Sequence, residues 1–265
     1  MIIKFQKFQG AGNDFIIIDN RNQVYEFTRE IVEYFCDRKF GIGADGLMLL
    51  ETCPGYDFKM RYFNGREASL CGNGSRCIVA YAHRLGLFLQ TTRFLAADGE
   101  HQGEITLQGV RVKMNDVSRI TVTPDYFFLD TGSPHYVKVV ADAFQTDVVT
   151  AGRMIRYAPS FQPGGTNVNF ITPTPACIRI ATYERGVEDE TLACGTGCVA
   201  AALSAALLNH DHSGTYTLQT KGGILKVSFK QLADNHFTDI WLEGPAEFVF
   251  AGEIETPQNR DKKAM

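Results

Sequence analysis

The chain has 265 residues, 45% of them hydrophobic and 21% charged, and its formal net charge is −4. These values are typical of a folded protein with one large domain or two of medium size. The mild negative charge and the lack of a basic run argue against a nucleic-acid partner. Residues 1–6 lack the apolar core of a signal peptide, and no apolar segment reaches 18 residues. We therefore expect a cytoplasmic protein without a membrane anchor.

Seven cysteines are scattered through the chain without any C-x-x-C pair. An odd number at irregular spacing does not predict a disulfide framework. Free cysteine commonly behaves as a small buried hydrophobe. We expect this of five cysteines: Cys36, Cys53, Cys77, Cys177 and Cys198.

The first half of the chain alternates strands with glycine-rich turns and one helix. The predicted elements are a strand at 3–8, a turn at 10–14, a strand at 15–18, a helix at 28–38, a glycine loop at 41–46 and a strand at 47–50. The glycine loop precedes a strand instead of opening a helix, so it is not a dinucleotide fingerprint.

A cysteine motif then opens the second helix of this half. The segment 67–74 reads Glu-x-x-x-Cys-Gly-x-Gly around Cys71, and the apolar residues that follow predict a helix ending near Gly86. Period-two alternation next predicts strands at 92–97 and 104–114. Short polar residues follow, and we place a domain boundary near residue 117.

The second half repeats this order, and its cysteine motif recurs at Cys194, 123 positions after Cys71. The run 199–208 that follows contains Ala, Val and Leu with a single serine. A helix that is apolar on every side is buried all round, so a sheet must surround it. We predict an α/β (α+β) fold of two pseudo-symmetric domains, residues 1–117 and 118–251, with 252–265 as a tail that returns to the N-terminal half.

A cysteine directly before a helix is chemically distinctive. Its sulfur lies beside unpaired backbone N–H groups and the positive end of the helix dipole, where a thiol can become a thiolate. The same N–H groups can bind a carboxylate. Two such thiols on opposite faces of one carbon could remove a proton from one face and return a proton to the other. That reaction is racemisation or epimerisation next to a carboxylate.

Two other interpretations of the cysteines stay open at this point. Both Cys71 and Cys194 could be packing residues, although a motif that occurs twice makes this the weaker interpretation. A non-catalytic metal or redox protein could use these two with Cys77 and Cys198. Structural zinc sites favour ligand pairs two to four residues apart, which Cys71 and Cys77 do not offer. The zinc content of the purified protein would separate this class from an enzyme.

Several segments together closely resemble the diaminopimelate epimerases. The similarity runs in order through nearly the whole chain and rests on residues 10–15 (GAGNDF), 71–77 (CGNGSRC), 167–170 (NVNF) and 183–197 (YERGVEDETLACGTG). Paired Cys-Gly motifs also occur in proline racemase-like enzymes. The segments GNDF and ERG favour the diaminopimelate branch.

This resemblance implies a fold in which each domain is a curved, mixed β-sheet wrapped around a central helix. It implies an enzyme without cofactor or metal that interconverts L,L- and meso-diaminopimelate, in lysine and peptidoglycan precursor biosynthesis. Cys71 and Cys194 would be the catalytic acid/base pair. The residues that would bind the reacting carboxylate are Gly72, Asn73, Gly195 and Thr196. Those that would recognise the distal amino-acid group are Asn13, Asn64, Asn167, Glu184 and Arg185.

The resemblance leaves two matters open. A proline or hydroxyproline epimerase would keep the thiol pair but act on a substrate with a single amino-acid group. The small-molecule substrate is the one partner implied, and a homodimer is left open.

Three positions depart from the family pattern. Asn64 is followed directly by Gly65, two residues short of the usual Asn-x-Asp-Gly loop. Ser133 stands where many members have Asn, and Gly46 where they have Gln. These differences concern substrate affinity and not the type of reaction. We interpret His135, which follows a proline at a strand start, as a hydrogen-bonded structural residue.

Overall fold

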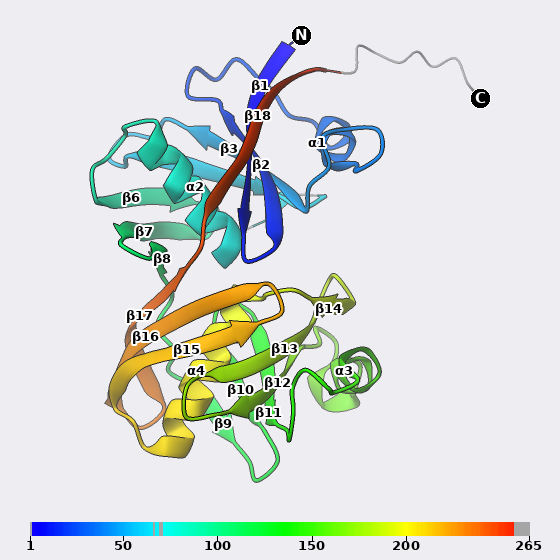
Figure 1. The fold of residues 1–265 in the computed structure, drawn as a ribbon, viewed down its shortest axis with the longest axis vertical. Helices are drawn as coiled ribbons and strands as arrows, with labels where there is room; N and C mark the ends of the chain where they lie inside the picture. The colour runs from blue at the N-terminus through cyan, green and yellow to red at the C-terminus, as the bar shows by residue number, and fades with distance from the viewer. Residues whose placement is uncertain (1, 66, 69–70, 257–265) are drawn as a thin grey trace, which may run out of the picture. The chain divides into compact units, whose positions relative to one another are not determined.

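A computed structural model describes residues 2–65, 67–68 and 71–256 (Figure 1). It separates into two compact units, formed by the described residues of Met1–Val110 with Ala246–Met265 and by Arg111–Pro245. None of the helices in these residues has the length and apolar character needed to cross a membrane.

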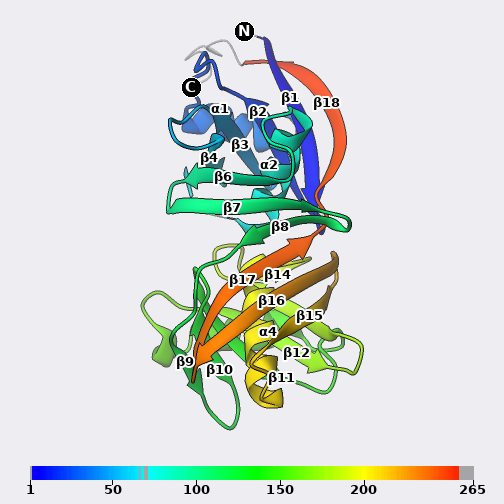
Figure 2. The same ribbon diagram turned by 90° about the vertical axis from the view of Figure 1, so that its left-hand side faces the viewer.

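The first unit contains two helices and a mixed sheet. Its elements are β1 (Ile2–Gly10), β2 (Asn13–Asp19), α1 (Arg29–Cys36), β3 (Gly46–Glu51), β4 (Phe58–Phe63), β5 (Glu67–Ala68), α2 (Gly72–Arg84), β6 (Thr91–Ala96), β7 (Gly99–Thr106), the beginning of β8 (Gly109–Lys113) and, from the end of the chain, β18 (Glu247–Glu255). Figure 2 shows β18 beside β1, with which it pairs in antiparallel fashion.

The second unit contains the remaining elements. They are β9 (Ile120–Val122), β10 (Phe127–Asp130), β11 (Pro134–Val139), α3 (Val148–Arg156), the 3-10 helix η1 (Pro159–Phe161), β12 (Asn167–Pro173), β13 (Ile178–Glu184), β14 (Asp189–Thr191), α4 (Gly195–Asn209), β15 (Ser213–Thr220), β16 (Gly223–Ala233) and β17 (His236–Gly244).

The strand pairings repeat between the units. In the first, β2 and β3 are parallel, β3 and β4 antiparallel, and β4 and β6 parallel around the short β5. In the second, β11 and β12, β12 and β13, and β13 and β15 follow the same sequence of directions around β14. The predicted fold class, two similar α/β units with a central helix in each, is confirmed.

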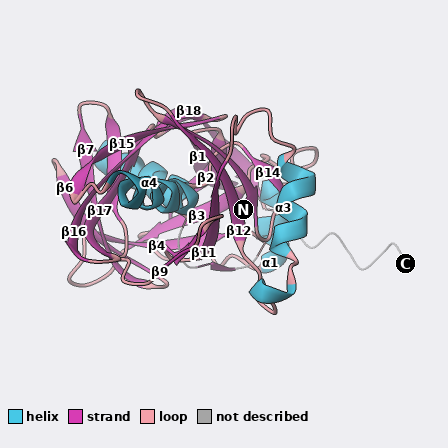
Figure 3. Ribbon diagram, turned by 90° about the horizontal axis from the view of Figure 1, so that it is seen from below, coloured by secondary structure: helices cyan, strands magenta, loops and turns pink. Residues whose placement is uncertain are grey.

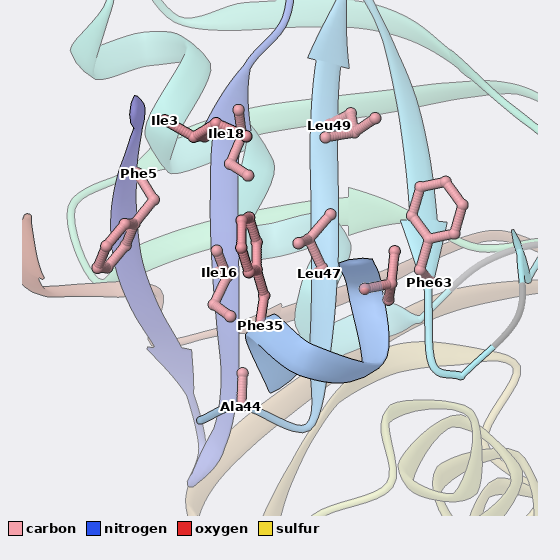
Figure 4. Close-up of a cluster of buried hydrophobic side chains, with 10 residues drawn as sticks. Ile3, Phe5, Ile16, Ile18, Phe35, Ala44, Leu47, Leu49 and Phe63 are labelled. Atoms are coloured by element: carbon pink, nitrogen blue, oxygen red, sulfur yellow. The ribbon is translucent and has the colours of Figure 1, made fainter. Parts of the chain in front are cut away.

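Strands β2 and β3 are buried on both faces, which explains their continuous apolar sequences. Because side chains alternate along a strand, Ile16, Ile18, Leu47 and Leu49 face one side. Figure 4 shows them on the face of the sheet that α1 covers, in one hydrophobic cluster with Phe35 of α1. The residues between them face the other side, where α2 packs. In the second unit α3 and α4 cover the sheet in the same way.

Helix α4 is enclosed as its composition predicts. Its residues are buried from Gly195 to Ala206 except Thr196, which is partly exposed. The helix contacts strands β10 to β13 and β15 to β17 of its own unit, and Figure 3 shows strands on all sides of it. The burial of small apolar side chains around its whole circumference makes this helix the core of the second unit.

The observed boundaries differ from the sequence expectations in three places. The first unit ends at Val110 instead of residue 117, because Val117 pairs with Phe237 of the second unit. The chain returns at Ala246 instead of residue 252, because all of β18 pairs with β1. The single strand predicted at 104–114 is wrong: Leu107 is fully exposed in a turn that separates β7 from β8. Residues 257–265 of the predicted tail lie outside the described residues.

Candidate active site

Both motif cysteines lie immediately before a helix, in extended backbone conformation. The carbonyl oxygen of Cys71 accepts the Ser75 N–H at 2.7 Å, and that of Cys194 accepts the Cys198 N–H at 2.9 Å. Each cysteine is therefore the N-cap of its helix, and the next three N–H groups have no carbonyl within the helix to bind. The first two of these groups in each unit belong to the predicted carboxylate-binding residues, Gly72 and Asn73 in the first and Gly195 and Thr196 in the second.

In the first unit, Asn13 of β2 lies beside the cysteine. Its Oδ1 is 3.6 Å from the Cys71 Sγ and accepts a hydrogen bond from Asn73 Nδ2 at 3.3 Å. Its Nδ2 donates to Asp45 at 2.6 Å. Asn73 in turn accepts from the fully buried Arg76 at 2.9 Å. The structure therefore brings three predicted site residues into one hydrogen-bonded group.

Asn64 is separate from this group. It is exposed in the turn after β4, next to Gly65, whose φ is +81°. Within the described residues it makes none of the hydrogen bonds that join Asn13, Cys71 and Asn73.

In the second unit, a hydroxyl group lies beside the sulfur. Thr196 Oγ1 is 3.4 Å from the Cys194 Sγ and 3.0 Å from the Nε2 of His135. This nitrogen is also 3.0 Å from Ser133 Oγ. His135 is fully buried and its Nδ1 lies 3.0 Å from Asn169 Nδ2. The interpretation of His135 as a hydrogen-bonded structural residue is thus confirmed, and the histidine directly contacts a site residue.

The contacts of Asn169 determine which way this network runs. Its Nδ2 donates to the Tyr136 carbonyl and its Oδ1 accepts from the Thr182 hydroxyl, each at 3.0 Å. Because an amide N–H donates, Nδ1 of His135 must accept and its Nε2 must carry the proton. The Nε2–H can then donate to Thr196 Oγ1, which leaves the threonine proton free to point at Cys194. The Thr196 hydroxyl and the Cys194 thiol can then form a hydrogen bond in either direction.

Three further predicted residues lie at the ends of β12 and β13. Asn167 Oδ1 accepts the backbone N–H of Arg185 at 2.8 Å, and its Nδ2 donates to Ser133 Oγ at 3.1 Å. The guanidinium of Arg185 donates to the Gly164 carbonyl at 3.3 Å. Glu184 is partly buried at the end of β13. Asn167 and Arg185 are therefore joined directly, and Glu184 immediately precedes Arg185 in the chain.

Burial shifts the pKa of both Cys194 and His135. It raises the pKa of Cys194 well above its usual value, and the negative charge of Glu184 adds to the rise. Hydrogen bonds from Thr196 and from the Gly197 N–H oppose the rise in pKa. Burial, with the charge of Arg185, also lowers the pKa of His135 to about 3, so its imidazole is neutral at pH 7.

None of the other five cysteines is the N-cap of a helix. Cys77 and Cys198 are fully buried inside the two central helices, as predicted. Burial raises the pKa of Cys36 to about 11 and that of Cys77 still further. Within the described part of the chain, no three His, Cys, Asp or Glu side chains are grouped as metal ligands.

Sequence reasoning missed several residues that support the site. Asp45, Arg76 and Asn169 were not assigned, although each is hydrogen-bonded to a predicted site residue or to His135. A signal existed for Asn169, because it lies two residues after Asn167 and so faces the same side of the strand. Asp45 offered no signal, because a carboxylate in a glycine loop is ordinary turn chemistry.

The fold is shared with solved structures of several enzymes. A PhzF-family phenazine biosynthesis protein from Bacillus anthracis matches with a TM-score of 0.78 at 14% identity, over 96% of this chain and 99% of that one. A hydroxyproline epimerase from Agrobacterium vitis matches with a TM-score of 0.70 at 12% identity, over 96% and 92%. These structures and the paired N-cap cysteines define the class: a two-unit α/β protein of the PhzF and proline racemase-like fold.

Sequence relatives specify the family within this class. The profile of the family described as diaminopimelate epimerase matches residues 5–120 and 127–249. The diaminopimelate epimerase of Flavobacterium psychrophilum is 45% identical over 95% of this chain and its own full length. That of Chlorobaculum tepidum is 44% identical over 92% of this chain and 98% of its own. The chain belongs to the diaminopimelate epimerase family.

Proposed function

We propose that this protein interconverts L,L- and meso-diaminopimelate by two-base proton transfer, with Cys71 and Cys194 as the acid/base pair. The single observation that supports this most strongly is that each repeat has its cysteine as the N-cap of a central helix. Family membership supplies the substrate.

In the proposed reaction, one cysteine as thiolate removes the α-proton and the other as thiol donates a proton to the opposite face. The N–H groups of Gly72, Asn73, Gly195 and Thr196 would bind the α-carboxylate and stabilise the negative charge that develops on it. The mechanism requires both sulfurs to flank one α-carbon. Because the reaction is reversible, each sulfur is the base in one direction and the acid in the other.

The second amino-acid group of the substrate would be recognised by polar residues other than the N–H groups at the two helix starts. We assign this role to Asn13, Asn64, Asn167, Glu184 and Arg185. The guanidinium of Arg185 suits a carboxylate, and its backbone is held by Asn167. A substrate without a second amino-acid group would leave these groups unpaired, which disfavours it.

The proposal extends to surroundings and partners. We propose a cytoplasmic enzyme that acts on a small molecule, without nucleic-acid or membrane partners and without cofactor or metal. A homodimer is supported by the exposed apolar residues Phe248, Val249 and Phe250 of β18. Sedimentation equilibrium of the wild type and of Val249→Lys tests it, because a dimer through this strand would dissociate in the variant.

Proton NMR of L,L-diaminopimelate in D₂O with the reduced, purified protein tests the reaction. Loss of the α-proton signal together with appearance of the meso isomer, with no cofactor added, is the expected result. Exchange with proline or hydroxyproline but not with diaminopimelate would overturn the assignment in favour of a racemase of the related branch. The sequence relatives favour the first outcome, because those at 44–45% identity are diaminopimelate epimerases, whereas the hydroxyproline epimerase is 12% identical.

A further inference from the structure

The orientation of the Asn13 amide is fixed by a carboxylate. Its Nδ2 is 2.6 Å from Asp45 Oδ2. An ionised carboxylate only accepts hydrogen bonds, so the amide nitrogen must face Asp45 and the amide oxygen must face Cys71 and Asn73. A reversed amide would place its oxygen against the carboxylate and its nitrogen against the Asn73 donor. Asp45 thus determines what Asn13 presents to the site.

Asp45 is itself held in place by charged groups. Arg38 donates to Asp45 Oδ1 at 2.6 Å and to both oxygens of Asp14, at 2.7 and 3.0 Å. The backbone N–H groups of the two aspartates each donate to the other's carboxylate. The buried Lys7 pairs with Asp14 at 2.8 Å. An isolated exposed ion pair contributes little to stability. Here two carboxylates bind one guanidinium, and backbone N–H groups bind both carboxylates as well, so the Asp45 side chain is held in one position.

Ionisation of Asp14 keeps this cluster charged. Burial alone would raise its pKa, but hydrogen bonds from Arg38 and Lys7 and the charge of Lys7 lower the pKa well below its usual range. Asp14 therefore remains an acceptor at neutral pH and keeps the Arg38 guanidinium in position to bind Asp45.

The orientation of the second amide, that of Asn73, is fixed by a hydrogen-bond donor. Arg76 Nη2 donates to Asn73 Oδ1 at 2.9 Å, so the Asn73 nitrogen must face Asn13 Oδ1. A carboxylate at one end and a guanidinium at the other therefore impose the same direction on both amides. This agreement fixes the Asn13 oxygen as the acceptor beside Cys71.

We propose that Asp45, held by Arg38, is a positioning residue that commits Asn13 to present a hydrogen-bond acceptor to the substrate and to the Cys71 thiol. Asn13 then selects an N–H donor of the substrate, its ammonium group, and not a carboxylate. The inference rests on the proposed function for the role of Asn13 in substrate binding. The orientation of the amide beside Cys71 does not depend on it.

The test compares Asp45→Ala and Asp45→Asn with Glu100→Ala. Glu100 is a matched control, because like Asp45 it is a carboxylate that accepts from an arginine of the same unit, here Arg93 through two hydrogen bonds. Iodoacetamide is added to each ligand-free protein and peptide mass spectrometry gives the alkylation rates of Cys71 and Cys194. In Asp45→Ala we expect Cys71 to react about fivefold faster, the equivalent of one net hydrogen bond to its thiol, with Cys194 unchanged.

The steady-state constants give a second readout. In Asp45→Ala the KM for diaminopimelate should rise about tenfold while kcat changes less than about threefold, because a binding group is loosened and both sulfurs are retained. Asp45→Asn should lie between Asp45→Ala and wild type, because one amide oxygen can replace only one of the two acceptors. Glu100→Ala should match wild type in all measurements.

Two outcomes would overturn the inference. One is a Cys71 alkylation rate in Asp45→Ala and Asp45→Asn equal to that of wild type. The other is an equal change at Cys194 or in Glu100→Ala, which would indicate general loosening. The expected alkylation pattern in proteins that all fail to epimerise diaminopimelate would support the positioning role while rejecting the proposed function, so the two failures are distinguishable.

Discussion

The two cysteines occupy equivalent places in the repeat, but different groups face their sulfurs, an amide oxygen at Cys71 and a hydroxyl at Cys194. Beside Cys71 the Asn13 oxygen is an acceptor, and it suits a protonated thiol. Beside Cys194 lies the Thr196 hydroxyl, which can donate to the sulfur or accept from it and which also contacts His135. The repeat thus duplicates the helix start but not the hydrogen-bonding group beside the sulfur.

The layer beneath each helix start explains the difference. In the parallel pairing β2–β3 the residue at the first position is Phe15, and in β11–β12 it is His135. Gly74 of α2 packs on Phe15 and Met48, whereas Gly197 of α4 packs on Asn169. An apolar layer cannot orient a hydroxyl, whereas the His135–Asn169 layer does. The polarity of two buried positions therefore distinguishes the surroundings of Cys194 from those of Cys71.

The largest expected effect is on the two sulfurs. Cys71→Ser and Cys194→Ser should each lower kcat for epimerisation about 10³-fold, because a hydroxyl is a far weaker acid/base at neutral pH. Stability should change little. The measurement is kcat by NMR in both directions, with Cys53→Ser as the control cysteine. Retention of activity in either variant would show that the reaction does not require both cysteines.

The next effect concerns the polar layer of the second unit. Asn169→Leu leaves the His135 Nδ1, the Tyr136 carbonyl and the Thr182 hydroxyl without their partner. Unfolding free energy should fall by about 3 kcal/mol, since buried polar groups left unpaired are costly. The matched change Met48→Leu conserves volume in the apolar layer and should cost less than about 1.5 kcal/mol. Urea unfolding of both variants measures the difference, and equal losses would contradict the comparison.

The sequence predicts the repeat and both helix starts because these depend on local signals. Cys-Gly-x-Gly followed by an apolar run predicts a buried helix, and Gly72 and Gly195 are the first residues of the observed helices. The turn at Leu107 was missed because an exposed leucine continued the alternation of apolar residues expected for a strand.

The supporting networks could not be predicted because they depend on tertiary pairing. Arg38 precedes the glycine loop, Asp45 lies within it, and Asp14 follows a turn 24 residues before Arg38. Their carboxylates and guanidinium meet only because β2 and β3 pair in parallel. Asn13 was assigned from a motif, but the reason its amide points as it does lies in these partners.

A smaller effect should distinguish the two helix glycines. A Cβ on Gly197 would meet Asn169 Oδ1 at 2.5 Å, whereas one on Gly74 would meet the flexible Met48 sulfur at 3.2 Å. Gly197→Ala should lower the unfolding free energy by about 2 kcal/mol through overpacking. Gly74→Ala should be close to neutral, because the gain in helix propensity offsets a mild contact. Equal urea midpoints for the two variants would show that the Asn169 layer yields as easily as Met48.

The smallest effect is a pH dependence of stability that comes from His135. The equivalent residue of the first unit, Phe15, has no titratable group. His135 has a pKa of about 3 in the folded protein and 6.5 as its ordinary value. Between these values the unfolded chain binds a proton that the folded chain does not, so stability decreases as pH falls below 6.5. One such histidine should lower the unfolding free energy by about 1.5 kcal/mol between pH 6.5 and pH 5. His135→Gln should be less stable at pH 7 but should lose that part of the slope, and an unchanged slope would mean that the buried imidazole is protonated in the folded protein.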